Sequence, residues 1–255
     1  MPDLTFLQTI IAGSLTAAAG GLLGSFALLR RMALVGDALS HVALPGIALG
    51  ILFNFNPSLG AFIFLLVGTG AIWAIEHKTK LPVDTLVGVF FTLALAIGAI
   101  LTPKAEILEA LFGDITSITA FDFWIAALLS LFIIVFLLIV SKNLTLTMIS
   151  PDLAISIGLK PHRLEFVFLL FFALAVALGI KFIGALLMGS LIIIPAAISR
   201  NLSGSMRSYQ LLSIVIGVIG AVAGITVSHF YGVAPGPAFI LFTGLLFFLS
   251  IFFRR

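Results

Sequence analysis

The stretch Gly36-Asp-Ala-Leu-Ser-His-Val-Ala-Leu-Pro-Gly46 lies inside an apolar run long enough to span a membrane, and it brings a carboxylate and an imidazole into that run. A charged carboxylate near the bilayer centre costs about 2.5 to 3.5 kcal/mol on insertion scales, so ionisable residues there indicate a functional site. Asp37 and His41 are four residues apart, which on a helix places them on one face with Cβ atoms about 5 to 6 Å apart. They are candidate ligands of one metal ion, because a carboxylate oxygen and an imidazole nitrogen suit zinc, and also manganese or ferrous iron.

The same pair also has a structural interpretation. Asp37 can pair with a polar group on a neighbouring helix, and His41 can be a hydrogen-bonded core histidine. Spacing and depth alone leave both interpretations open. Pro45 follows His41 by four residues, where its ring clashes with the His41 carbonyl and removes a helical hydrogen bond, so we expect a kink beside the pair.

The composition excludes a soluble domain. Of the 255 residues, 62% are hydrophobic and only 9% are charged, and the mean hydropathy is +1.32, which is far from the composition of soluble proteins. The chain has no cysteine, which excludes disulfides and thiolate metal sites. Its basic residues lie in short loops between apolar segments rather than on one soluble face, so we expect a lipid bilayer around the chain and no nucleic-acid partner.

Nine apolar segments of roughly spanning length predict an all-α fold, a polytopic membrane bundle of eight to nine transmembrane helices in a single transmembrane domain over residues 1–255. The segments are 4–29, 32–53, 58–75, 82–101, 121–140, 164–181, 183–199, 208–231 and 236–253. The break at 181–183 is very short, and a re-entrant element there would give eight spans and invert the N-terminal half.

The distribution of lysine and arginine predicts the orientation. With Arg30 and Arg31 in the cytoplasm, the N-terminus is outside, and the loops 76–81, 141–163 and 200–207 lie inside together with the C-terminus. Lys104 and Lys181 are then the exceptions that face out, in agreement with the positive-inside rule. The outer loop 102–120 carries Glu106, Glu109 and Asp114, and it is either a solvated loop or a docking surface for an external partner.

The inner loop 141–163 contains a predicted short helix that begins after Ser150 as N-cap. Pro151 is the expected first helical residue, Asp152 complements the positive helix end, and Gly158 ends the helix. Two turns cannot bury Leu153, Ile155 and Ile157 by themselves. We therefore expect this helix to contact another surface, either a partner or its own membrane domain.

Two other residues are weaker candidates for a metal path. Met188 is interpreted as a packing residue, although its thioether is a possible soft ligand. His229 ends a segment before a turn rich in helix breakers and is interpreted as an interfacial histidine rather than an outer metal ligand. His77 and His162 lie in basic loops and are expected to be solvated.

Several catalytic motifs are absent from the sequence. It contains no phosphate-binding loop, no His-Glu-x-x-His helix and no Gly-x-Ser-x-Gly elbow. We therefore expect a transport subunit rather than an enzyme, with any energy source on a partner. A membrane enzyme that uses Asp37 and His41 as acid and base is disfavoured, because few other polar residues share their depth. A secondary carrier in which Asp37 binds protons remains an alternative.

Six motifs in one order resemble the membrane permease subunit of bacterial ABC-type zinc, manganese and iron importers, with the zinc permease most similar. The motifs are Gly36-Asp-Ala-Leu-Ser-His41, Val83-Asp-Thr-Leu-Val-Gly88, Leu111-Phe-Gly-Asp-Ile115, Ser150-Pro-Asp-Leu-Ala154 with Gly158, Lys181-Phe-Ile-Gly-Ala-Leu186 with Ile192-Ile-Ile-Pro-Ala-Ala197, and Gly236-Pro237. Ala234 departs from the family pattern, in which Asp or Thr precedes the Pro-Gly-Pro turn.

The resemblance implies a homodimeric channel in the bacterial plasma membrane, two copies of a cytosolic ATPase and an extracytoplasmic metal-binding protein. Asp37 and His41 match positions that the family uses for the ion, which is cargo rather than a bound cofactor. A two-fold axis would bring two carboxylates and two imidazoles around one path, enough for tetrahedral zinc. Zinc is the expected ion, with manganese or iron as alternatives. The residues implied to couple the channel to the ATPase are Pro151, Asp152, Leu153, Ala154, Ile157 and Gly158.

Overall fold

The described chain is built from helices, as expected for apolar segments whose backbone hydrogen bonds must be satisfied within lipid. The computed structural model describes residues 4–101 and 119–253. Its helices and one 3-10 turn, η1, are α1 (Leu4–Leu29), α2 (Val35–Val42), α3 (Leu44–Leu52), α4 (Pro57–Thr79), α5 (Val83–Leu101), α7 (Ala120–Ile149), α8 (Pro151–Ser156), α9 (Pro161–Ile183), η1 (Ala185–Leu187), α10 (Met188–Leu202), α11 (Met206–Tyr231) and α12 (Pro235–Ile251).

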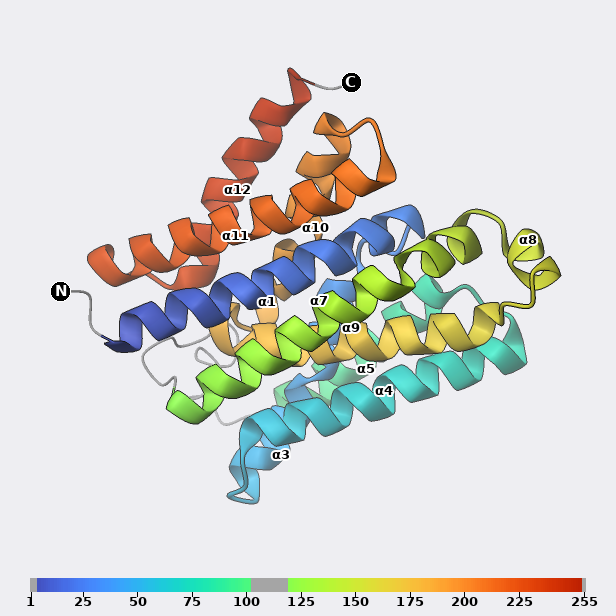
Figure 1. The fold of residues 1–255 in the computed structure, drawn as a ribbon. Helices are drawn as coiled ribbons and strands as arrows, with labels where there is room; N and C mark the ends of the chain where they lie inside the picture. The colour runs from blue at the N-terminus through green and yellow to red at the C-terminus, as the bar shows by residue number, and fades with distance from the viewer. Residues whose placement is uncertain (1–3, 102–118, 254–255) are drawn as a thin grey trace.

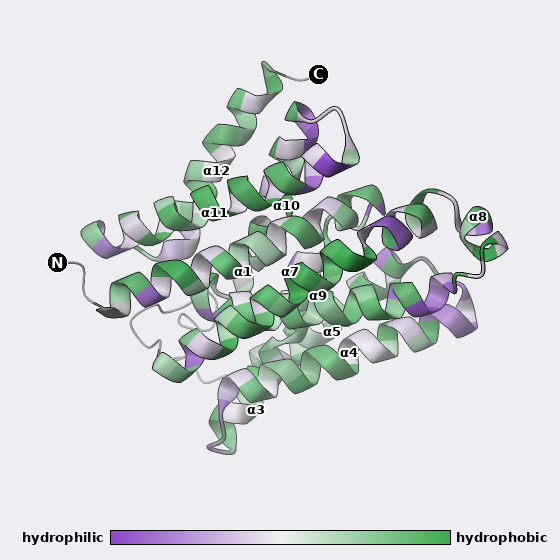
Figure 2. Ribbon diagram, viewed as in Figure 1, coloured by the Kyte–Doolittle hydropathy of each residue, from purple (hydrophilic) through white to green (hydrophobic). Residues whose placement is uncertain are grey.

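The predicted polytopic helical bundle is confirmed. In the described ranges, seven helical stretches are long and apolar enough to cross a membrane, with α2 and α3 counted together as Val35–Leu52, and α10 and α12 are shorter apolar helices. Figure 2 shows that apolar residues cover most of the helix lengths, whereas hydrophilic residues gather towards the helix ends. This distribution is the one that a bilayer solvent selects.

Helix α1 lies in the middle of the bundle, with α10 and α11 on one side and α7 and α9 on the other (Figure 1). Gly21 allows the close approach of α11, because a Cβ there would collide with the Ser213 carbonyl. On the other side, the buried Thr16 and Ser130 hydroxyls lie 3.2 Å apart and join α1 to α7. Small residues at helix crossings are typical of membrane bundles, where packing rather than hydrophobicity drives association.

The second apolar segment is broken, as Pro45 predicts. Helix α2 ends at Val42, α3 begins at Leu44, and Pro45 lies in the first turn of α3. Proline is tolerated there because its missing N–H falls where the helix start needs no donor. The break separates the ionisable part of the segment, α2, from its wholly apolar part, α3.

The basic residues gather at one end of the bundle, which we call the α8 end. It contains the C-terminal ends of α1 and α4 and the beginnings of α5, α9 and α11 (Figure 1). Here Arg30, which follows the last residue of α1, forms an ion pair with Glu165 of α9. At the opposite end, Lys181 pairs with Asp122 at 2.6 Å, and His229 stacks on Phe6.

The predicted loop 141–163 is wrong in its first part. Helix α7 continues past Val140 to Ile149, and its 30 residues extend about 45 Å, more than the roughly 30 Å of a bilayer core. Hydropathy falls after Val140, but the helix persists because Leu144 is buried and Ser141 bonds to Gln210 of α11. The non-helical connection is therefore confined to the residues around α8.

The short break predicted at 181–183 is a buried turn between two separate helices. Helix α9 ends at Ile183, Gly184 adopts φ +88°, and the chain turns through η1 into α10. Ala185 and Met188 are fully buried, so this irregular backbone lies inside the protein and not in lipid. Non-helical backbone at membrane depth is tolerated in such a position.

Candidate functional site: the Asp37–His41 pair

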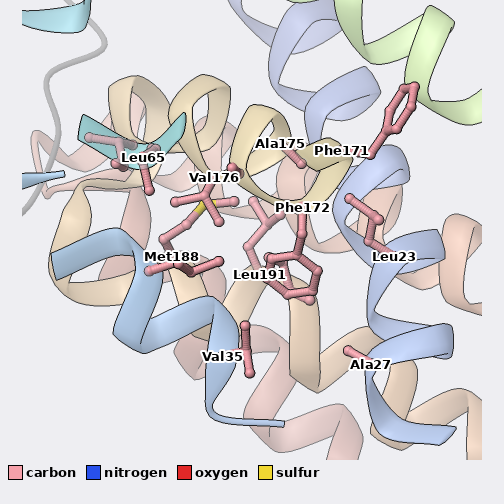
Figure 3. Close-up of a cluster of buried hydrophobic side chains, with 14 of the residues drawn as sticks. Leu23, Ala27, Val35, Leu65, Phe171, Phe172, Ala175, Val176, Met188 and Leu191 are labelled. Carbon is pink, nitrogen blue, oxygen red and sulfur yellow. The ribbon is translucent and has the colours of Figure 1, made fainter. Parts of the chain in front are cut away.

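Asp37 and His41 occupy successive turns of α2, as their spacing predicts. The helix is buried on nearly all sides, Asp37 is partly buried, and His41 is 6% exposed. An apolar cluster packs beside α2; Figure 3 shows Val35 near Met188 and Phe172, which belong to α10 and α9. The two ionisable side chains therefore belong to a well-packed element.

The backbone of α10 closes directly on Asp37. A Cβ added to Gly189 would lie 2.7 Å from the Asp37 Cβ and 2.9 Å from its Cα, so only glycine fits there. Ser40 reinforces the contact, because its hydroxyl lies within hydrogen-bond distance of the Asp37 carbonyl, at 2.6 Å, and also of the Ala185 carbonyl of η1. The η1–α10 segment thus sets the position of α2.

The His41 ring leaves one nitrogen without a partner. Its edge packs against Phe91 of α5, with ring centroids 5.0 Å apart and planes inclined by 71°. Nδ1 is buried, and no residue in the described ranges bonds to it. Nearly all buried polar atoms in proteins have a hydrogen-bond partner, so the orphan nitrogen makes His41 a candidate ligand-binding residue.

Asp37 opens onto a cavity between α2 and α5. The cavity has a volume of about 420 Å³ and is lined by Arg31, Asp37, Asp84 and Phe91, among other residues. Asp84 is exposed in the first turn of α5, and no sequence pattern assigns it a role by itself. Its only signal was its place in the Val83–Gly88 motif, because nothing local relates it to Asp37.

The described residues of one copy do not form a complete metal centre by themselves. Among the described residues, no three His, Asp or Glu side chains lie close enough together to hold an ion. The pair therefore supplies one carboxylate and one imidazole, and no third His, Asp or Glu of the described ranges joins them.

Helix α8 matches the predicted short helix in position, with two differences. Ser150 is its N-cap residue, but the Ser150 side chain makes no capping hydrogen bond, and the helix ends at Ser156. Gly158, with φ +83°, completes a Schellman ending in which Leu159 N–H bonds to the Ala154 carbonyl. Gly158 therefore ends this helix from the C′ position.

The apolar face of α8 has no cover within the described residues. Leu153, Ile155 and Ile157 are 59%, 59% and 66% exposed, whereas Ala154 is fully buried. Helix α8 contacts α7 and α9, which accounts for the burial of Ala154 but leaves the larger side chains exposed. The sequence predicts that this helix contacts either a partner or its own membrane domain. The membrane domain covers only Ala154.

The other candidates fall outside the α2 site. Met188 is fully buried against Gly179, in accord with a packing role. His229 is exposed at the opposite end and stacks on Phe6. His77 and His162 are exposed, as expected, but they lie next to each other, which no local pattern indicated. The acidic stretch with Glu106, Glu109 and Asp114 lies outside the described residues.

Comparison with known proteins agrees with the motifs. The ABC 3 transport family matches residues 3–254. The chain is 32% identical over 238 residues to the high-affinity zinc uptake system membrane protein ZnuB of Haemophilus influenzae, covering 91% of each protein. It is 31% identical over 255 residues to the manganese import system permease protein ScaB of Streptococcus gordonii, covering 98% of this chain and 92% of that protein.

A solved structure extends the likeness to three dimensions. A chain of PsaBC from Streptococcus pneumoniae, solved in complex with Fab, superposes with a TM-score of 0.86 at 27% identity, covering 99% of this chain and 93% of that one. The match runs through all the elements described above. The family, the two relatives and the shared architecture lead to one conclusion: the chain is a permease subunit of the ABC 3 transport family.

Proposed function

We propose that the chain is the transmembrane channel subunit of an ATP-driven divalent metal importer and that zinc is its ion. The orphaned, buried Nδ1 of His41, one helical turn from Asp37, is the observation that carries this proposal. A two-fold axis beside α2 would supply a second Asp37 and His41, which completes four donors around one ion. In this arrangement the whole of 1–255 acts as one membrane domain.

The donor types favour zinc over manganese. The named relatives transport either metal, so family membership alone leaves the ion open. Two imidazoles among four ligands suit zinc, whereas manganese prefers a shell of carboxylates and water. The site must bind the ion only moderately, so that the ion can be released into the cytoplasm. A change in the distance between the two subunits would lower the affinity by separating their ligands.

The two ends of the bundle have different roles in this proposal. The α8 end carries nearly all the described basic residues, which supports a cytoplasmic position for this end and for the C-terminus by the positive-inside rule. There the exposed face of Leu153, Ile155 and Ile157 docks on the ATPase. An extracytoplasmic binding protein delivers the ion at the opposite end.

Uptake by the reconstituted complex tests the proposal. The permease is combined with its ATPase and binding protein in proteoliposomes, and zinc and manganese uptake are compared for the native chain, Asp37→Ala, His41→Ala and the control His229→Ala. We expect both site variants to lose zinc uptake while the complex still assembles, and the control to keep it. Normal zinc uptake by both site variants would place the ion path elsewhere. Faster uptake of manganese than of zinc by the native chain would replace zinc with manganese as the assigned ion.

A further inference from the structure

A second pair of metal-ligating side chains lies at the α8 end, away from α2. His77 is in the last turn of α4 and His162 is in the first turn of α9. Their ring centroids are 5.0 Å apart, and the ring planes are inclined by 85°. The packing of α4 on α9 brings together two imidazoles that are far apart in the sequence.

The spacing of the two rings fits a shared ion. Two imidazoles that bind one tetrahedral ion, each with a metal–nitrogen distance of about 2.0 to 2.1 Å, have ring centroids about 5 Å apart. The observed separation of 5.0 Å is compatible with this value. The two rings are therefore close enough to bind one ion once rotation of the side chains turns a nitrogen of each towards it.

Trp73 holds both histidines. Its indole stacks on the His77 ring, with centroids 5.9 Å apart and planes inclined by 16°, and its Nε1–H donates to the His162 carbonyl at 3.4 Å. One side chain therefore limits the position of a ring on α4 and of the backbone on α9. Such supporting contacts orient ligands before the ion arrives.

The surroundings are open and offer a balancing charge. Glu76, His77, Lys80 and His162 line one cavity of about 370 Å³, and both histidines are exposed to solvent. Within 4–101 and 119–253, the side-chain hydrogen bonds include none to either imidazole ring, and Trp73 bonds to the backbone carbonyl of His162. Glu76 offsets part of an ion's charge, whereas Lys80 opposes binding and lowers the affinity.

We propose that His77 and His162 bind a divalent transition-metal ion of the zinc and nickel class, at a site separate from Asp37 and His41. Imidazole nitrogens select such ions over calcium and magnesium. No third His, Asp or Glu joins the pair in the described part of the chain, so water completes the coordination shell. With two protein ligands, the site binds more weakly and exchanges faster than a structural zinc centre.

Tryptophan fluorescence provides a direct test, because the chain has only two tryptophans. In the untagged full-length chain, Trp124→Phe leaves Trp73 as the sole emitter, 5.9 Å from the His77 ring. Nickel chloride is titrated into this protein in lipid nanodiscs. We expect saturable quenching that zinc chloride reverses by displacing the nickel. Absence of saturable quenching would overturn the proposal.

Matched variants identify the ligands. His77→Ala and His162→Ala should each raise the nickel concentration for half-quenching at least about tenfold, the effect of losing about 1.4 kcal/mol of binding free energy. His41→Ala and His229→Ala should leave it unchanged, which separates this site from the proposed ion path. His77→Cys keeps a donor atom and should retain quenching, and metal-free Trp73 emission checks the local fold. Unchanged quenching in both alanine variants, or its loss in His229→Ala, would refute the assignment.

Discussion

The Asp37–His41 pair and the His77–His162 pair contrast in burial and in origin. The first lies on one helix, with His41 6% exposed and its Nδ1 orphaned, whereas the second joins two helices at the exposed α8 end. A buried nitrogen without a partner is costly, so on a helix that also carries Asp37 it supports a functional role. An exposed imidazole costs nothing because water satisfies it, and only its geometry relative to another ligand is informative.

The buried pair should be intolerant of crowding. Gly189→Ala places a methyl group 2.7 Å from the Asp37 Cβ, so α2 or α10 must move. A metal site tolerates changes of only about 0.2 Å in its metal–ligand distances, so a displaced Asp37 should lower zinc uptake by well over tenfold. The overpacking should also lower the free energy of unfolding by about 1 to 3 kcal/mol. Uptake by reconstituted complexes and thermal unfolding measure the two effects.

Gly244→Ala is the matched control for this change, because nothing lies within 4 Å of the Cβ it adds. It should leave uptake within about twofold of the native rate. Normal uptake by Gly189→Ala would mean that the position of Asp37 is not critical, which would remove the distinction between a rigid buried pair and an adaptable exposed one.

The exposed end should tolerate substitution in the isolated chain but not in the complex. Leu153→Asp removes an apolar contact worth about 1.5 to 3 kcal/mol when buried against a partner, so transport-linked ATP hydrolysis should fall about tenfold or more. Thermal stability of the permease alone should not change. Ser156→Ala, also exposed on α8, is the control. Full coupling in Leu153→Asp would assign the ATPase contact to another surface.

The histidine pair should depend on its tryptophan. Trp73→Phe keeps a ring against His77 but removes the hydrogen bond to the His162 carbonyl, which is worth about 0.5 to 1.5 kcal/mol. We expect zinc binding at the α8 end to weaken about two- to tenfold, measured by equilibrium dialysis in the His41→Ala background. Trp124→Phe serves as the control. Equal binding by the two variants would show that the rings need no support.

Asp84 should have the smallest effect, because it is exposed at the edge of the cavity that Asp37 lines. Exposed charge interactions are worth about 0 to 1 kcal/mol, so Asp84→Asn should lower zinc uptake by up to about fivefold. High salt should reduce the difference through screening. A complete loss of uptake in Asp84→Asn would instead make this residue an essential part of the ion path.

Local chemistry was enough to predict much of the fold and part of the site. The apolar segments, the shared face of Asp37 and His41, the break before Pro45 and the turn at Gly158 all appear as expected. Each depends on residues within a few positions of one another, through helical spacing, a missing N–H or a left-handed φ. The bilayer strengthens these signals, because it leaves few alternatives to a helix.

Contacts between remote segments decided the rest. The extension of α7 to Ile149, the fit of Gly189 against Asp37, the shared cavity of Asp37 and Asp84, and the meeting of His77 with His162 all depend on which helices pack together. Hydropathy along a chain reports how each segment partitions into lipid. It carries no information on which faces of two helices meet, since that choice rests on side-chain shape and close packing between segments that are distant in sequence.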